Sequence, residues 1–123
     1  MKRLVVESWL LLLYFECLMC IRGFQRVHAA VREQAVNVAA KHTESGTLSR
    51  AADFACVFYF KRVMCLQRSA ATAVLLRRHG WNAEMVIGMQ LLPIQSHAWV
   101  ELDGRVVNDK PYINEIFQVL ERC

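Results

Sequence analysis

Three residues in the second half of the chain have the side chains needed for thiol-based peptide chemistry: Cys65, His97 and Asp109. A thiolate attacks a carbonyl, an imidazole takes the thiol proton and later protonates the leaving amine, and a carboxylate holds the imidazole in one tautomer. A cysteine or a histidine alone is more often a packed core residue. The three together, with the cysteine at a predicted helix start and the others on predicted paired strands, favour a catalytic triad.

The segment CLQRSAATAVLLRRHG predicts a helix from about Cys65 to His79, which Gly80 ends. Free backbone N–H groups and the helix dipole favour a thiolate at this N-terminus. The Cys65 N–H is also a candidate donor to an oxyanion. Gln67 and Arg68 are weaker substrate-binding candidates, for orienting or polarising a peptide, and both suit a solvated first turn equally well.

The segment SHAWVELDGRVVND predicts a hairpin that turns at Asp103-Gly104, and two loops are compatible with it. A two-residue type I′ turn would point Asp109 away from His97. A three-residue loop over 102–104, with Gly104 in the left-handed conformation, sets His97 directly opposite Asp109, with Cβ atoms about 5 Å apart. A triad therefore predicts the bulged loop, because a slip of one residue separates the pair.

The elements before these segments must position them. The spacing of apolar residues predicts helices over 4–21, 24–40 and 49–62, with Ser49 as the N-cap of the last. The segment AEMVIGMQ predicts a strand that joins the hairpin in a three-stranded antiparallel meander. The expected fold class is therefore α+β, with N-terminal helices packed on a small antiparallel sheet and the nucleophile at a helix N-terminus.

Length and charge restrict the class of protein. The 123 residues suit a single domain, with a helical N-terminal part over 1–48 and a catalytic core over 49–123. The net charge of +4, without a long run of Lys or Arg, disfavours nucleic-acid binding. The longest uninterrupted apolar run near the N-terminus, Trp9–Phe15, is too short for a bilayer, so no membrane span is expected.

The cysteines indicate a reducing compartment. Their number, five, is odd and their spacing is not that of a disulfide framework, which favours the cytoplasm. The CxxC of Cys17 and Cys20 lacks the second pair that a zinc site needs, and its place in an apolar helix is not typical of a redox motif. The sequence contains no metal or nucleotide motif, so no cofactor is expected.

The segment from Cys65 to Asp109 resembles the B2 proteins of lasso-peptide biosynthesis, in the transglutaminase-like branch of the papain-type cysteine protease superfamily. The resemblance covers roughly residues 50–112, and the N-terminal part fits in length and apolar character alone. The matching pieces are Cys65-Leu66-x-Arg68-Ser69, Leu75-Leu76-Arg77-Arg78-His79-Gly80, Val86-Ile87-Gly88, and His97-Ala98-Trp99-Val100-Glu101 with Asp109.

This resemblance implies a leader peptidase, which cuts a ribosomally made precursor peptide at its leader–core junction before a separate ATP-dependent cyclase closes the macrolactam. Nucleophile, base and orienting acid carry over to Cys65, His97 and Asp109. Since no leader-recognition domain precedes the catalytic part, the protein is expected to need a leader-recognition partner, the B1 protein. Its apolar N-terminal helices, or an apolar groove beside the sheet, are the expected docking surface.

Other functions of the same fold stay open. A non-catalytic adaptor would bind the leader and present it to another enzyme, but it would not need an intact triad. An acyl transferase would form the same thioacyl intermediate and release it to an amine instead of water. Trp99 is a weak candidate for the wall of a substrate groove, although core packing is the favoured interpretation.

Overall fold

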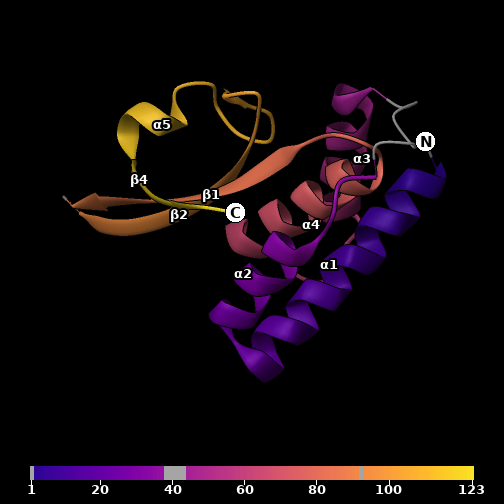
Figure 1. Cartoon of the computed structure of the whole chain (residues 1–123). Coiled ribbons are helices and arrows are strands. Elements are labelled where there is room, and N and C mark those ends of the chain that lie inside the picture. The colour runs from indigo at the N-terminus through magenta and orange to yellow at the C-terminus, as the bar shows by residue number, and fades with distance from the viewer. Residues whose placement is uncertain (1, 38–43, 92) are drawn as a thin grey trace.

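The computed structural model describes residues 2–37, 44–91 and 93–123. The helices within residues 2–78 pack together at one end of the molecule, and the sheet extends from them toward the other end (Figure 1). This arrangement confirms the predicted α+β class. The elements in chain order are α1 (Lys2–Arg22), α2 (Phe24–Glu33), α3 (Ser45–Val57), α4 (Cys65–Arg78), β1 (Ala83–Leu91), β2 (Ile94–Leu102), β3 (Arg105–Val106), α5 (Ile113–Ile116) and β4 (Gln118–Arg122).

Helix α1 contributes one face to the core. Leu11, Leu12 and Phe15 are buried there, and the helix packs against α2, α3 and α4. Its 21 residues and mean hydropathy of 2.0 also meet the criterion of length and composition for a helix that crosses a membrane. This finding differs from the expectation of no membrane span, which rested on the shorter uninterrupted run Trp9–Phe15. Core helices and signal sequences meet the same criterion, so this finding is weak support for a span.

Helix α2 ends at Glu33, earlier than the predicted 24–40, whose last residues lie outside the described part of the chain. Arg77 explains the end point, because its side chain is buried beside the last turn and donates to the carbonyl oxygens of Val31 and Gln34. Its Nε also donates to the Ala83 carbonyl at 2.8 Å. One arginine of α4 therefore joins α2 to the start of β1.

Helix α3 begins at Ser45, one turn before the predicted start. The prediction of Ser49 as its N-cap is wrong, because Ser49 lies inside the helix and its N-cap is Glu44. The buried Ser49 hydroxyl instead donates to the Val107 carbonyl at 2.9 Å. This bond links α3 to the chain that follows β3.

The sheet has four antiparallel strands in the order β3-β2-β1-β4. The predicted meander accounts for β1, β2 and β3, although β3 has two residues. Strand β4 was not predicted, and it adds to the free edge of β1 with a shift of register between Ile87 and Gly88.

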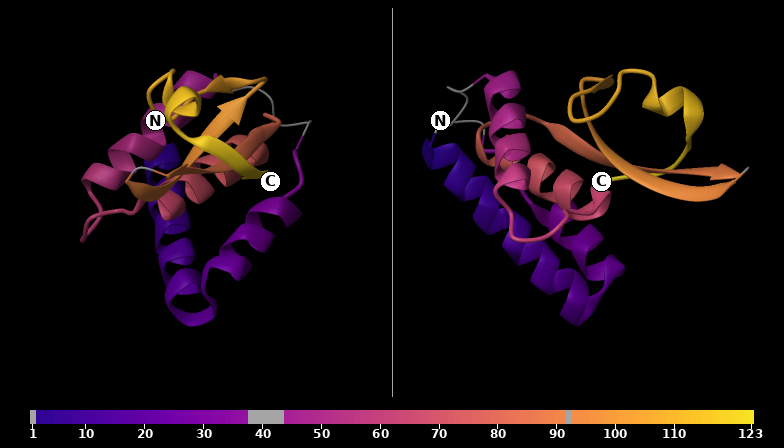
Figure 2. Two further views of the ribbon diagram at one scale, coloured as in Figure 1. Left: turned by 90° about the vertical axis from the view of Figure 1, so that its left-hand side faces the viewer. Right: turned by 180° about the vertical axis from the view of Figure 1, so that it is seen from behind.

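The two faces of the sheet are covered differently. Met85, Val100 and Leu102 belong to the main core with the helices, whereas Val86 and Trp99 form a second cluster with residues of the C-terminal segment. Figure 2 shows this segment, with α5, on the side of the sheet away from the helices.

Candidate active site

The hairpin between β2 and β3 has a two-residue turn. Asp103 and Gly104 both have positive φ, 53° and 78°, and Leu102 pairs with Arg105. These features belong to a type I′ turn, whose twist matches that of the flanking strands. The prediction of a bulged three-residue loop, which would have paired Glu101 with Arg105, is therefore wrong.

Asp109 reaches His97 in spite of this register, because the regular backbone pairing with β2 ends before the chain reaches Asp109. The last backbone bond between the strands runs from the Val107 N–H to the Val100 carbonyl at 3.0 Å. The Val100 N–H then donates to the Asn108 side-chain Oδ1 at 2.7 Å, in place of a strand carbonyl. The two-residue alternation of a strand no longer applies after this point, so Asp109 can turn toward the histidine.

A buried polar network fixes this departure. The Asn108 amide donates to the Ser69 hydroxyl at 3.2 Å, and Ser69 donates to the Ala98 carbonyl at 3.0 Å. Ser69 and Asn108 are 0% and 9% exposed. The segment that carries Asp109 is therefore held to α4 and β2 by bonds that solvent barely reaches, which are costly to break.

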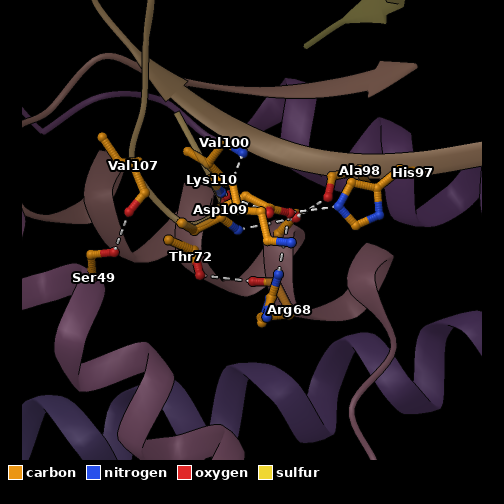
Figure 3. Close-up of polar contacts among 11 residues, drawn as sticks. Ser49, Arg68, Thr72, His97, Ala98, Val100, Val107, Asp109 and Lys110 are labelled. Atoms are coloured by element: carbon orange, nitrogen blue, oxygen red, sulfur yellow. Dashed lines mark hydrogen bonds and ion pairs between the residues drawn. The ribbon is translucent and has the colours of Figure 1, made fainter. Parts of the chain in front are cut away.

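Asp109 lies between His97 and Arg68, as Figure 3 shows. Its Oδ2 is 2.5 Å from His97 Nε2 and 3.6 Å from Arg68 Nη2, and its Oδ1 accepts the Lys110 N–H at 2.8 Å. Burial alone would raise the pKa of Asp109. The hydrogen bonds from His97 and from the Lys110 backbone, with the charges of His97 and Arg68, outweigh it and hold the pKa below its ordinary value.

Aromatic rings fix the position of the imidazole. The His97 ring stacks on Phe117 at 5.3 Å between centroids and lies 6.2 Å from the ring of Trp99. Gly88 is the register partner of His97, and a Cβ there would lie 2.6 Å from the Trp99 ring. Because Gly88 has no side chain, the Trp99 ring can occupy the space next to His97.

Cys65 is the first residue of α4 and is half-buried. With His97 it lines a single cavity of about 220 Å³. Arg68, one turn further along the same helix, is the residue that pairs with Asp109. The N-terminal turn of α4 therefore presents Cys65 to the cavity and an ion-pair partner to Asp109.

The three weaker candidates have different surroundings. Gln67 is buried and donates to Glu16 of α1 at 3.1 Å, so it is neither solvated nor in the cavity. Trp99 is fully buried and donates from Nε1 to Glu101 at 2.9 Å, which places it in the core and not on a groove wall. Arg68 contacts Asp109, and this contact gives it a role in positioning the acid.

Sequence reasoning missed Asn108, Ser69 and Phe117 as parts of the site. A sequence signal existed for Asn108, because an asparagine directly before the acid can replace a backbone acceptor. Among the described residues, no group of three or more His, Cys, Asp or Glu side chains is arranged to hold a metal ion.

Comparison with known proteins relates the chain to a family. A stretch of 56 residues is 38% identical to the microcin J25-processing protein McjB of Escherichia coli, and it covers 46% of this chain and 27% of that protein. No solved structure matches the chain. The similarity to McjB confirms the resemblance to lasso-peptide B2 proteins. The family described as the transglutaminase-like superfamily matches residues 9–122, nearly the whole sequence, and the chain belongs to that superfamily.

Proposed function

We propose that this protein is a cysteine peptidase that removes the leader from a ribosomally made lasso-peptide precursor. The observation that carries the proposal is the shared cavity of Cys65 and His97, with Asp109 bonded to the far nitrogen of the histidine. The similarity to a protein named for processing microcin J25 supports a peptide precursor as the substrate.

The contact between His97 and Asp109 supports a route for each proton. Asp109 engages Nε2 of His97, so Nδ1 is the ring nitrogen left to take the Cys65 proton. The sulfur then attacks the scissile carbonyl, and the Cys65 N–H at the helix start supports the oxyanion. The imidazolium, stabilised by Asp109, gives its proton to the leaving amine. Water, deprotonated by the same histidine, hydrolyses the thioester and restores the thiol.

The proposal includes partners. A leader-recognition B1 protein would hold the precursor, and the freed core amine would pass to a separate cyclase, all in the cytoplasm and without a cofactor in the peptidase. Four large apolar side chains on and just after α3 are exposed within seven residues of sequence, and exposed apolar surface supports a protein partner. The exposed members are Phe54, Val57, Phe58 and Phe60.

An intact-mass assay tests the proposal. The cognate precursor is incubated, with and without its recognition partner, with wild type, Cys65→Ala or Asp109→Ala. We expect wild type to release leader and core with the gain of one water, Cys65→Ala to release nothing, and Asp109→Ala to cut slowly. Cleavage by Cys65→Ala at the wild-type rate, or a stable complex that wild type never cuts, would replace the peptidase with the adaptor. A leader joined to an added amine would indicate acyl transfer.

A further inference from the structure

The cavity beside the candidate nucleophile has apolar walls. Apart from Cys65 and His97, its lining consists of Met19, Phe24, Leu66, Ile87, Ser96 and Ala98. These residues come from the last turn of α1, the start of α2, the first turn of α4, and strands β1 and β2. The N-terminal helices and the sheet therefore meet at the cavity, with the nucleophile between them.

The size and chemistry of the cavity restrict what can occupy it. Its 220 Å³ is below the roughly 300 Å³ at which pockets for drug-sized molecules begin, so it suits one side chain and not a length of peptide. Among the residues that the structure describes, no Asp, Glu, Lys or Arg lines it. A charged side chain would lose its hydration there without a partner, whereas an apolar side chain would gain from leaving water.

We propose that this cavity is the subsite for an apolar side chain, of the size of leucine or phenylalanine, on the acyl side of the cleaved bond. The acyl fragment stays bonded to Cys65 from attack until hydrolysis, so a cavity that includes Cys65 serves this fragment through both steps. Met19 and Phe24 form its outer wall, which makes the N-terminal helices part of the active site. This inference rests on the proposed function and specifies its substrate.

Peptide vinyl sulfones test the subsite without the precursor or its partner. Cys65 adds to the vinyl carbon, the C–S bond forms, the thiol proton ends on the neighbouring carbon, and nothing leaves. Two sets, acetyl-X-Gly-vinyl sulfone and acetyl-Gly-X-vinyl sulfone, carry Leu, Phe, Gly, Asp or Lys at X. The rate of modification at Cys65 is followed by intact mass and peptide mapping in a Cys17→Ser/Cys20→Ser background, because both of those thiols are exposed.

We expect the Leu or Phe probe of one set to modify Cys65 at least about tenfold faster than the Gly, Asp and Lys probes. Rates that differ by less than about threefold in both sets would overturn the inference, as would the fastest reaction with Asp or Lys. Cleavage of the precursor despite equal probe rates would leave the peptidase standing without this subsite. Clear probe selectivity with an uncut precursor would keep the subsite and remove the leader-peptidase function.

Variants of the outer wall locate the selectivity. Phe24→Ala removes the ring and is expected to reduce the preference for Leu or Phe probes by about fivefold or more. Leu120→Ala, at a residue 57% exposed and outside the cavity lining, is the control and should leave the preference unchanged. If thermal melting shows that Phe24→Ala is not folded, Phe24→Leu and Met19→Ala take its place. Unchanged selectivity in every folded wall variant would overturn the assignment.

Discussion

Replacement of Asp109 by asparagine tests the pair that orients the candidate base. The asparagine keeps the shape of the side chain but loses the charge that faces His97 Nε2 at 2.5 Å. Its amide group can also donate to Nε2, which would stabilise the tautomer that carries its proton on Nδ1. That tautomer cannot accept the proton of Cys65, so the substitution affects both the strength and the direction of the hydrogen bond.

The expected loss follows from the contacts of the carboxylate. A hydrogen bond to a charged group contributes about 1.5–3 kcal/mol net, which corresponds to roughly 10- to 100-fold in rate at about 1.4 kcal/mol per factor of ten. The wrong tautomer adds to this loss, so we expect kcat to fall at least about 100-fold. KM should change little, because Asp109 does not line the cavity that would receive substrate.

Single-turnover cleavage of the precursor, with its partner present, measures this loss. Asp109→Ala is the matched variant, because it removes the same hydrogen bond but offers no donor to Nε2. We therefore expect asparagine to be the slower of the two. Equal rates for wild type and both variants would refute the orienting role of Asp109. An asparagine variant faster than the alanine variant would refute the tautomer argument and leave the charge as the relevant term.

Three further predictions concern the support of the site. Gly88→Ala should lower the free energy of unfolding by about 1–3 kcal/mol in denaturant titrations, because the new methyl group meets the Trp99 ring. Asn108→Ala should cost about 1–3 kcal/mol in the same assay and slow cleavage, because it leaves the buried Val100 N–H without an acceptor. Stability should also depend on acid through Asp109. Its folded-state pKa is lowered from 3.8, so its contribution is present at neutral pH and is lost as the pH falls below that value. Wild type should therefore lose more stability than Asp109→Asn between pH 5 and the folded-state pKa, and parallel melting curves would contradict this.

Helix α4 and strands β1 and β2 were predicted because the residues that determine them lie within their own segments. The start of α4 at Cys65 follows from the helical pattern and the Gly80 stop, and both signals lie within the segment itself. Strands β1 and β2 follow from their apolar residues and the Asp103-Gly104 turn. Strand β4 has one half-buried position and four exposed ones, so its pattern is too polar to predict a strand, and its pairing with β1 supplies what the sequence lacks.

The site was harder to predict, because the interactions that fix Asp109 are distant in the sequence. The choice of a bulged hairpin assumed that Asp109 lies on a strand, where period-two alternation would decide its direction. The structure instead ends the ladder at Val107, through an asparagine side chain that depends on Ser69, 39 residues earlier. No turn rule contains this information.

An irregular segment has a physical advantage for the orienting acid. On a regular β3 strand with this turn, the residue at position 109 would face the opposite side of the sheet from His97. The buried hydrogen bonds of Asn108, to the Val100 N–H and to Ser69, replace the backbone bonds that a longer β3 strand would make. The segment can therefore turn Asp109 toward His97 without leaving the Val100 N–H unbonded. Helix α4 contributes two residues to the site: Cys65, the candidate nucleophile, and Arg68, which contacts Asp109. The first turn of α4 therefore helps to position both the candidate nucleophile and the candidate acid.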